Sequence, residues 1–279
     1  MKTALLQLNV SDDPTANLPR TVEMVQRAAD MGAEFVLTPE VTNCLSTSRT
    51  HQAQVLTDEA SDATLAALRD VAAARGIHLL IGSLALTTDD PDGRFANRSF
   101  LIGPDGSVLA RYDKIHMFDV AISKTETYAE SSGYRPGTKA VLARTNFAPI
   151  GMAVCYDMRF PKLSDALVSA GAHILTYPAA FSPVTGAAHW HSLLRARAIE
   201  AGAWVLAPAQ TGTHPSQKNK TRSTYGHSLA IDPWGEVVLD AGEAPGVYVF
   251  DMELDKVAEA RRRIPARDNA RPFEGPSGA

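Results

Sequence analysis

The chain has 279 residues, of which 45% are hydrophobic and 21% are charged. These proportions are typical of a globular protein and exclude a disordered or fibrous chain. The net charge of −4 gives no electrostatic reason to expect nucleic acid as a partner.

Strands and helices alternate along the first part of the chain, and meander-like strands follow. Short apolar runs are typical of buried strands, and apolar residues at near-helical spacing indicate two helices, each followed by a glycine. Clusters of aspartate, proline and glycine mark the turns between the later strands. We predict strands at 3–8, 34–38, 78–86, 98–103 and 107–113, and helices at 16–31 and 62–75.

The second half of the chain repeats this mixture. No Gly/Ser linker, fixed repeat or compositional break indicates a domain boundary. Two sheets, each covered by helices on one face, would bury this many apolar strands, so we expect one α/β domain over residues 1–279 with a C-terminal tail from about residue 264. We predict strands at 149–154, 173–177, 203–208, 225–232, 236–240 and 246–250, and helices after Pro161, over 187–201 and from about residue 254.

Cysteine usage and the first residues indicate where the protein resides. Cys44 and Cys155 are the only cysteines, too few for the disulfide framework of a secreted protein. Gln7 and Asn9 interrupt the first apolar run too early for a signal peptide, and no apolar stretch reaches the roughly 18 residues of a membrane span. We therefore expect a cytoplasmic protein that binds no membrane and whose cysteines are free to react.

Cys155 ends the apolar run of residues 150–154. A cysteine at such a junction is held rigidly beside backbone N–H groups, and this arrangement suits nucleophilic attack on an acyl group. The alternative is a buried, inert cysteine, which is how most free cysteines behave.

Two further residues of suitable chemistry also follow predicted strands. Glu40 ends the segment EFVLTPE, where partial burial would raise the pKa of its carboxyl group and let it accept the thiol proton. Lys114 follows strand 107–113, and a nearby ammonium would stabilise a thiolate of low pKa and a developing oxyanion. Taken singly, each could be an ordinary surface residue.

The segments around these three residues resemble the signature blocks of the nitrilase superfamily. They read TPE at 38–40, YDKIHMFD at 112–119 and AVCYDMRFP at 153–161, and the later blocks YPAAF, RARAIE and YGHSLAIDPWG are similar to it as well. The resemblance extends through nearly the whole chain and is strongest to the amidase branch. It implies a four-layer α-β-β-α sandwich with two mixed sheets flanked by helices, a homodimer or higher homo-oligomer, and no cofactor.

The resemblance also implies an activity. A member of this branch would cleave the non-peptide C–N bond of a small omega-amide that carries a carboxylate, with release of ammonia and with deaminated glutathione as the first expected substrate. The alternatives are alpha-ketoglutaramate, an N-carbamoyl or aliphatic amide, or a catalytically silent scaffold subunit that keeps only the fold.

By resemblance, each matching position acquires an expected role. Glu40 would be the general base, Lys114 and the backbone N–H of Tyr156 would stabilise the oxyanion, and Cys155 would form a thioester. Glu130 would be a second catalytic glutamate that orients the lysine. The substrate-binding positions would be Arg159, Phe181 and Thr185. The alternative for Arg159 is an ion pair with an aspartate such as Asp157.

Other chemistry has little support in the sequence. His189 and His191 lie two residues apart on a predicted helix, so their side chains point in different directions and cannot hold one metal ion. No HExxH, CxxC, GxSxG or glycine-rich phosphate motif occurs. We therefore expect no metal, and we expect Cys44 to be a pocket or packing residue.

Overall fold

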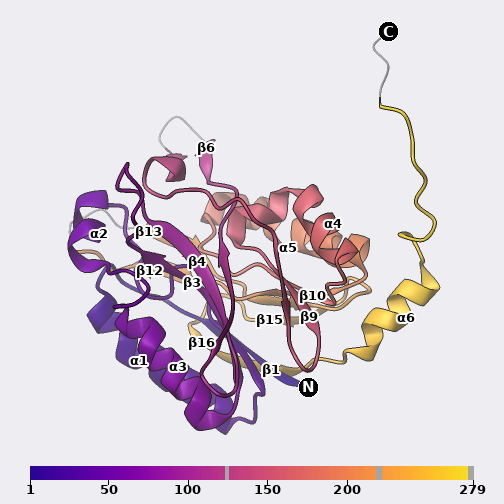
Figure 1. The fold of residues 1–279 in the computed structure, drawn as a ribbon, viewed down its shortest axis with the longest axis horizontal. Helices are drawn as coiled ribbons and strands as arrows, with labels where there is room; N and C mark the ends of the chain where they lie inside the picture. The colour runs from indigo at the N-terminus through magenta and orange to yellow at the C-terminus, as the bar shows by residue number, and fades with distance from the viewer. Residues whose placement is uncertain (123–125, 218–221, 276–279) are drawn as a thin grey trace.

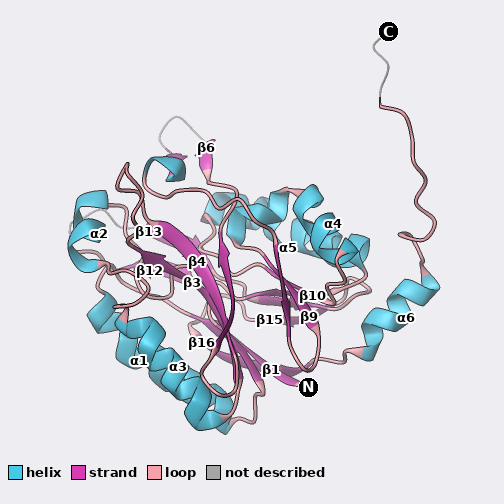
Figure 2. Ribbon diagram, viewed as in Figure 1, coloured by secondary structure: helices cyan, strands magenta, loops and turns pink. Residues whose placement is uncertain are grey.

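The computed structural model describes residues 1–122, 126–217 and 222–275. Two six-stranded mixed sheets pack face to face, and helices cover both outer faces (Figures 1 and 2). The expected α-β-β-α sandwich is therefore confirmed. The first sheet has the order β16 (Gly246–Asp251), β1 (Lys2–Gln7), β2 (Phe35–Leu37), β3 (His78–Leu86), β4 (Ala96–Ile102), β5 (Val108–Asp113). The second has the order β15 (Val237–Asp240), β14 (Leu229–Ile231), β11 (Trp204–Ala207), β10 (Ile174–Thr176), β9 (Pro149–Met152), β8 (Val141–Arg144).

Four helices form the two outer layers. α1 (Pro14–Asp30) and α3 (Ala63–Arg75) pack on the first sheet, and α4 (Pro161–Ser169) and α5 (Pro183–Ala201) pack on the second. α1 begins two residues earlier than predicted because the Asp13 side chain accepts hydrogen bonds from the N–H groups of Thr15 and Ala16 and so caps the first turn.

Side chains alternate between the two faces of each strand, so the first sheet contributes residues to two hydrophobic cores. Leu5 and Leu37 belong to the cluster that fills the space between the sheets, whereas their neighbours Leu6 and Val36 belong to the cluster beneath α1 and α3. Successive side chains of a strand point to opposite faces, so a strand that is apolar throughout can serve both layers. The first sheet is thereby buried on both sides.

Short elements account for most differences from the predicted elements. The predicted strand 225–232 is wrong as one unit, because Gly226 and His227 have positive φ angles of 76° and 54° that break it. It spans the last residue of β13 (Arg222–Tyr225) and all of β14. The unpredicted elements are short or irregular in pattern: α2 (Arg49–Val55), β6 (Asp119–Ala121), β7 (Thr127–Ala129), β12 (Thr211–His214) and β13 (Arg222–Tyr225). β8 was also missed.

The C-terminal segment lies at one side of the sandwich. The final helix α6 (Asp255–Arg263) is followed by an extended tail (Figure 1). The last four residues of the expected tail, 276–279, lie outside the described residues. Within the part of the chain that the structure describes, the helices lack the combination of length and apolar character that crossing a membrane requires.

Candidate active site

A cavity of about 590 Å³ lies where strands of both sheets end. Glu40 follows β2 by three residues, Lys114 follows β5 directly, and Cys155 follows β9 by three residues. All three side chains line this cavity, although the chain separates Glu40 from Cys155 by more than a hundred residues. The structure therefore brings together the three residues that the sequence singled out.

Lys114 is the centre of the polar network. Its side chain is only 2% exposed, and its Nζ lies 2.9 Å from Oε1 of Glu40 and 2.9 and 2.8 Å from the two oxygens of Glu130. Burial of an ammonium is unfavourable unless it is paired. Two carboxylates against one ammonium raise the pKa of Lys114 well above its ordinary value, despite the opposing effect of burial.

Cys155 lies at the start of a short 3-10 helix (Cys155–Arg159) and has a positive φ of 50°. Its N–H donates to the carbonyl oxygen of Pro178 at 2.9 Å. Asp157, which is completely buried, accepts hydrogen bonds from the Val154 N–H and the Tyr112 hydroxyl. These contacts fix a strained backbone at Cys155 and connect it to the strand that precedes Lys114.

The charge of Glu40 differs from the sequence-based expectation. Burial acts to raise the pKa of Glu40, but the charge and hydrogen bond of Lys114 outweigh it, so the pKa is lowered. The predicted raised pKa is therefore wrong, because the sequence could not show a buried ammonium in contact with the carboxylate. Glu40 is an anion in the resting site and is ready to accept a proton.

The Cys155 thiol also differs from expectation. Burial and the neighbouring Glu40 carboxylate raise its pKa well above the ordinary value, and Lys114 offsets them only in part. The expected low-pKa thiolate is therefore wrong for the resting site. Because the thiol and the carboxylate are within hydrogen-bonding reach, the arrangement allows attack and proton transfer to Glu40 to occur together.

The other predicted site residues divide into two groups. Glu130, Tyr156 and Phe181 line the cavity, whereas Arg159 and Thr185 are not part of its lining. The guanidinium of Arg159 faces the Phe181 ring at 5.5 Å and approaches His189, and no described carboxylate forms an ion pair with it. Cys44 both lines the cavity and packs in the core beneath α1 and α3.

Asn97 is a site residue that the sequence analysis missed. Its Nδ2 donates to Oε1 of Glu40 at 2.9 Å and to Oε1 of Glu130 at 3.3 Å, and its Oδ1 is buried without a hydrogen-bond partner among the described residues. The N–H of Ala180 donates to the second oxygen of Glu40 at 2.8 Å. Neither residue has a distinctive sequence signal, because an asparagine inside a strand and a backbone N–H belong to no motif.

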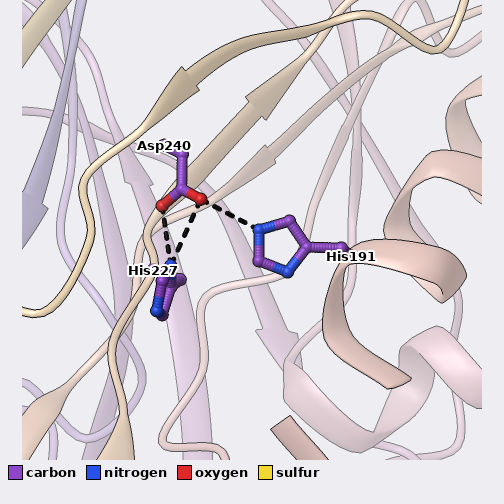
Figure 3. Close-up of side chains that lie close together, drawn as sticks. All are labelled: His191, His227 and Asp240. Carbon is purple, nitrogen blue, oxygen red and sulfur yellow. Dashed lines mark hydrogen bonds and ion pairs between the residues drawn. The ribbon is translucent and has the colours of Figure 1, made fainter. Parts of the chain in front are cut away.

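A separate group of possible metal ligands lies outside this cavity. His191, His227 and Asp240 place one ligand atom each within 4.8 Å of one another (Figure 3). The sequence-based prediction was only that His189 and His191 cannot hold one metal ion together, and it did not compare His191 with residues distant in sequence. The three residues of this group come from α5, from the residues after β13, and from β15.

Comparison with known protein families identifies the family of this chain. The model of the carbon-nitrogen hydrolase family matches residues 2–262. The chain belongs to this family. It is therefore a hydrolase of carbon–nitrogen bonds other than peptide bonds, and the resemblance to the nitrilase superfamily is confirmed.

Named relatives of this carbon-nitrogen hydrolase include amidases. The deaminated glutathione amidase of Synechocystis is 38% identical over 94% of this chain and 95% of its own length. The omega-amidase NIT2 of Mus musculus is 34% identical over 95% of this chain and 92% of its own length. Both names agree with the expected amidase branch.

Solved structures support the same family. The NitFhit protein of C. elegans has a TM-score of 0.88 and 33% identity over 97% of this chain, which spans 65% of the nematode chain. An amidase variant from Nesterenkonia has a TM-score of 0.75 and 26% identity over 97% of this chain and all of its own. In that protein, acrylamide has undergone Michael addition at the active-site cysteine.

Proposed function

We propose that this carbon-nitrogen hydrolase cleaves a small omega-amide that carries a carboxylate, with deaminated glutathione as the first substrate. The observation that carries the proposal is the Lys114 ammonium held between Glu40 and Glu130 beside Cys155 in one cavity. The name of the Synechocystis relative supports the choice of substrate. Alpha-ketoglutaramate is the second candidate, because the mouse relative is an omega-amidase.

The first half of the reaction forms a thioester. The sulfur of Cys155 attacks the amide carbon while its proton passes to Glu40, and the amide oxygen becomes an oxyanion next to Lys114 and the N–H of Tyr156. The carboxyl group of Glu40 then protonates the nitrogen as the C–N bond breaks. Net charge within the site is unchanged by the attack, which limits its cost in a buried cavity.

The second half restores the enzyme. Water attacks the thioester carbon, Glu40 takes a proton from the water, and the second tetrahedral intermediate breaks its C–S bond. The proton on Glu40 returns to the sulfur of Cys155, and a carboxylic acid is released. Glu130 keeps the ammonium of Lys114 positioned throughout, because both its oxygens accept hydrogen bonds from that ammonium.

The two candidate substrates differ in their leaving group. Alpha-ketoglutaramate is a primary amide and releases ammonia. In deaminated glutathione the nitrogen of the cleaved bond belongs to cysteinylglycine, so this dipeptide leaves, and the expected release of ammonia is wrong for this substrate. Both substrates give the same acyl group, a 2-oxoglutaryl thioester, and an assay must therefore measure 2-oxoglutarate.

The experiment supplies purified protein with both amides, an N-carbamoyl amino acid and an aliphatic amide, and measures the 2-oxoglutarate, free amino acid or aliphatic acid formed. The proposal expects deaminated glutathione to give the highest kcat/KM and the Cys155→Ala protein to be inactive although it remains folded. Preference for an N-carbamoyl or aliphatic amide would replace the proposed substrate. Inactivity toward the whole panel would favour a scaffold subunit.

We further propose that residues 1–279 act as one domain, that Phe181 of the cavity lining contacts the substrate, and that the protein is a cytoplasmic homodimer. Both cysteines are free, which suits a reducing compartment. α5 exposes Ile199, whose apolar side chain a second copy could cover. Light scattering on the eluting protein tests the dimer, and a monomeric mass would exclude it.

A further inference from the structure

Arg222, the first residue of β13, reaches the catalytic cavity and lies close to the reacting groups. Its Nη2 donates to the carbonyl oxygen of Ala180 at 2.6 Å, and the N–H of Ala180 donates to Glu40 at 2.8 Å. One residue thus connects the guanidinium to the carboxylate of the proposed general base. The hydrogen bond to Ala180 also fixes one end of the arginine side chain.

Apart from this hydrogen bond and a contact with the Tyr128 ring, the Arg222 guanidinium has no partner among the described residues. Among the described residues no carboxylate forms an ion pair with Arg222, and its Nε is buried without a hydrogen-bond partner. Arg98 provides a contrast, because it contacts both oxygens of Asp113 and one oxygen of Glu59. A buried hydrogen-bond donor without a partner costs free energy. The guanidinium has five N–H donors in one plane, and this arrangement suits a planar anion such as a carboxylate.

The other cations of the cavity are less suited to bind an anion. Lys114 already contacts two glutamates, and Arg49 is exposed at the cavity lining. Arg222 is half-buried, and the Tyr128 ring lies 5.7 Å from its guanidinium. Partial burial strengthens an ion pair with a substrate because less water competes for the charges.

We propose that Arg222 binds the substrate carboxylate and thereby determines which amides are hydrolysed, an inference that rests on the proposed amidase function. The guanidinium offers two parallel N–H groups to the carboxylate. This role differs from the one expected for Arg159, which lies outside the cavity lining. Deaminated glutathione has one carboxylate on its oxoglutaryl part and one on its glycine, whereas alpha-ketoglutaramate has only the first.

The kinetic test compares Arg222→Met and Arg222→Lys on both substrates and on pentanamide, a primary amide without charge. We expect Arg222→Met to lower kcat/KM for carboxylate substrates by roughly 10- to 100-fold, mainly by raising KM. A loss of this size corresponds to the free energy of one charge-assisted hydrogen bond. Pentanamide should lose much less kcat/KM than the carboxylate substrates, because it has no carboxylate for Arg222 to bind, and lysine should restore part of the loss. Arg195→Met is the matched control, because Arg195 also donates to one carbonyl oxygen, that of Gly235, away from the cavity.

The pattern of losses identifies the carboxylate. A lower kcat/KM with both substrates would mean that Arg222 binds the oxoglutaryl carboxylate. A lower kcat/KM with deaminated glutathione alone would mean that it binds the glycine carboxylate. An Arg222→Met protein within about twofold of wild type on both substrates would overturn the inference. Equal loss on pentanamide would also overturn it, since this result indicates general damage to the site.

A binding measurement separates this inference from the proposed function. If the wild-type protein hydrolyses neither substrate, the function proposed above fails, and calorimetry then tests Arg222 with 2-oxoglutarate and with a dipeptide that ends in glycine. The Cys155→Ala protein should bind one of these ligands, and the Cys155→Ala, Arg222→Met protein should bind it at least about 10-fold more weakly. Equal binding, or none by either protein, would refute the role of Arg222.

A second observation, independent of the first, concerns His191, His227 and Asp240 (Figure 3). Nε2 of His191 lies 2.9 Å from Oδ2 of Asp240, and Nδ1 of His227 lies 2.9 Å from Oδ1. The two imidazole rings face the same carboxylate from different elements. Their exposed fractions of 36% and 22% leave the group accessible to solvent.

The backbone holds this group in place. The left-handed conformation of His227 is fixed by its N–H, which donates to the Gly242 carbonyl oxygen, and by its own carbonyl oxygen, which accepts from Nε1 of Trp190. The N–H of Gly242 donates to Asp240, and the ring of His227 stacks on Tyr225 at 4.6 Å. Ligands that are already positioned lose little entropy when an ion binds.

We infer that His191, His227 and Asp240 form a binding site for one divalent transition-metal ion such as Zn²⁺, with water completing the coordination. Two imidazole nitrogens and one carboxylate favour Zn²⁺, Ni²⁺ or Cu²⁺ over Mg²⁺ and Ca²⁺. Each neutral ring would bind the ion through the nitrogen that faces Asp240 and would carry its single proton on its other nitrogen.

The test is calorimetric titration of untagged protein with Zn²⁺, in the Cys155→Ala background so that the active-site thiol cannot bind the ion. We expect one Zn²⁺ per chain, loss of this binding in His191→Ala and Asp240→Ala, and retention in His189→Ala, a histidine on the same helix outside the group. Co²⁺ should give visible absorption bands that the same two variants abolish. No binding, or unchanged binding in both variants, would overturn the site.

Discussion

The ammonium of Lys114 lies 2.9 Å from Oε1 of Glu40, and both side chains are almost fully buried. This contact determines the protonation state of the site. It keeps Glu40 ionised although burial alone would favour the neutral carboxyl group. Consequently Glu40 is an anion at neutral pH, whereas Cys155 is a thiol.

Replacing Glu40 with glutamine should remove the base while preserving most contacts. We expect kcat to fall by about 10²- to 10⁴-fold, the usual contribution of a positioned general base. Single-turnover formation of 2-oxoglutarate measures the effect. Glu34→Gln, an exposed change six residues earlier, serves as the control and should retain full activity. Near-normal turnover by Glu40→Gln would exclude Glu40 as the base.

Alkylation of Cys155 should follow the raised pKa of its thiol. Because the thiolate is the reactive form, the rate with iodoacetamide should rise with pH through 9 and should not level off near neutrality. Mass spectrometry of the labelled peptide distinguishes Cys155 from Cys44, whose pKa burial raises to about 12. A plateau between pH 6 and 8 would indicate a resting thiolate and contradict the charge state described above.

Asn97→Asp should change the pH dependence of the reaction. The new carboxylate would face Glu40 and Glu130 in place of a donor, and a like charge raises the pKa of a neighbouring carboxyl group. The acid limb of kcat/KM should therefore move to higher pH. Asn97→Ala should lower kcat roughly 10-fold through the loss of a hydrogen bond to a charged group. Identical profiles for Asn97→Asp and wild type would show that Asn97 does not position Glu40.

Gly82→Ala should destabilise the fold at the edge of the cavity. A Cβ atom at Gly82 would lie 2.1 Å from the carbonyl oxygen of Thr38 and 2.5 Å from that of Pro39, so the backbone that precedes Glu40 would have to move. We expect a loss of at least about 2 kcal/mol in the free energy of unfolding, measured with urea. Gly246→Ala, whose Cβ atom would have the Tyr248 ring as its nearest neighbour at 3.1 Å, should cost much less.

Local signals in the sequence predicted most of the fold. Apolar runs and helical spacing located the main strands and helices, because burial imposes these patterns on the residues themselves. Glu40, Lys114 and Cys155 each follow a strand, and this position is visible in the sequence. Short hairpins such as β12 and β13 were missed because a few residues of mixed polarity carry little periodicity.

The sequence by itself determined the class of fold, the family and the three side chains of suitable chemistry. Only the tertiary structure decided their protonation states, because a pKa depends on burial and on charges that the chain brings from distant positions. For the same reason it alone revealed Asn97 beside Glu40, Arg222 in the cavity and His227 beside Asp240. Contacts between residues far apart in sequence arise from packing, and no local pattern records them.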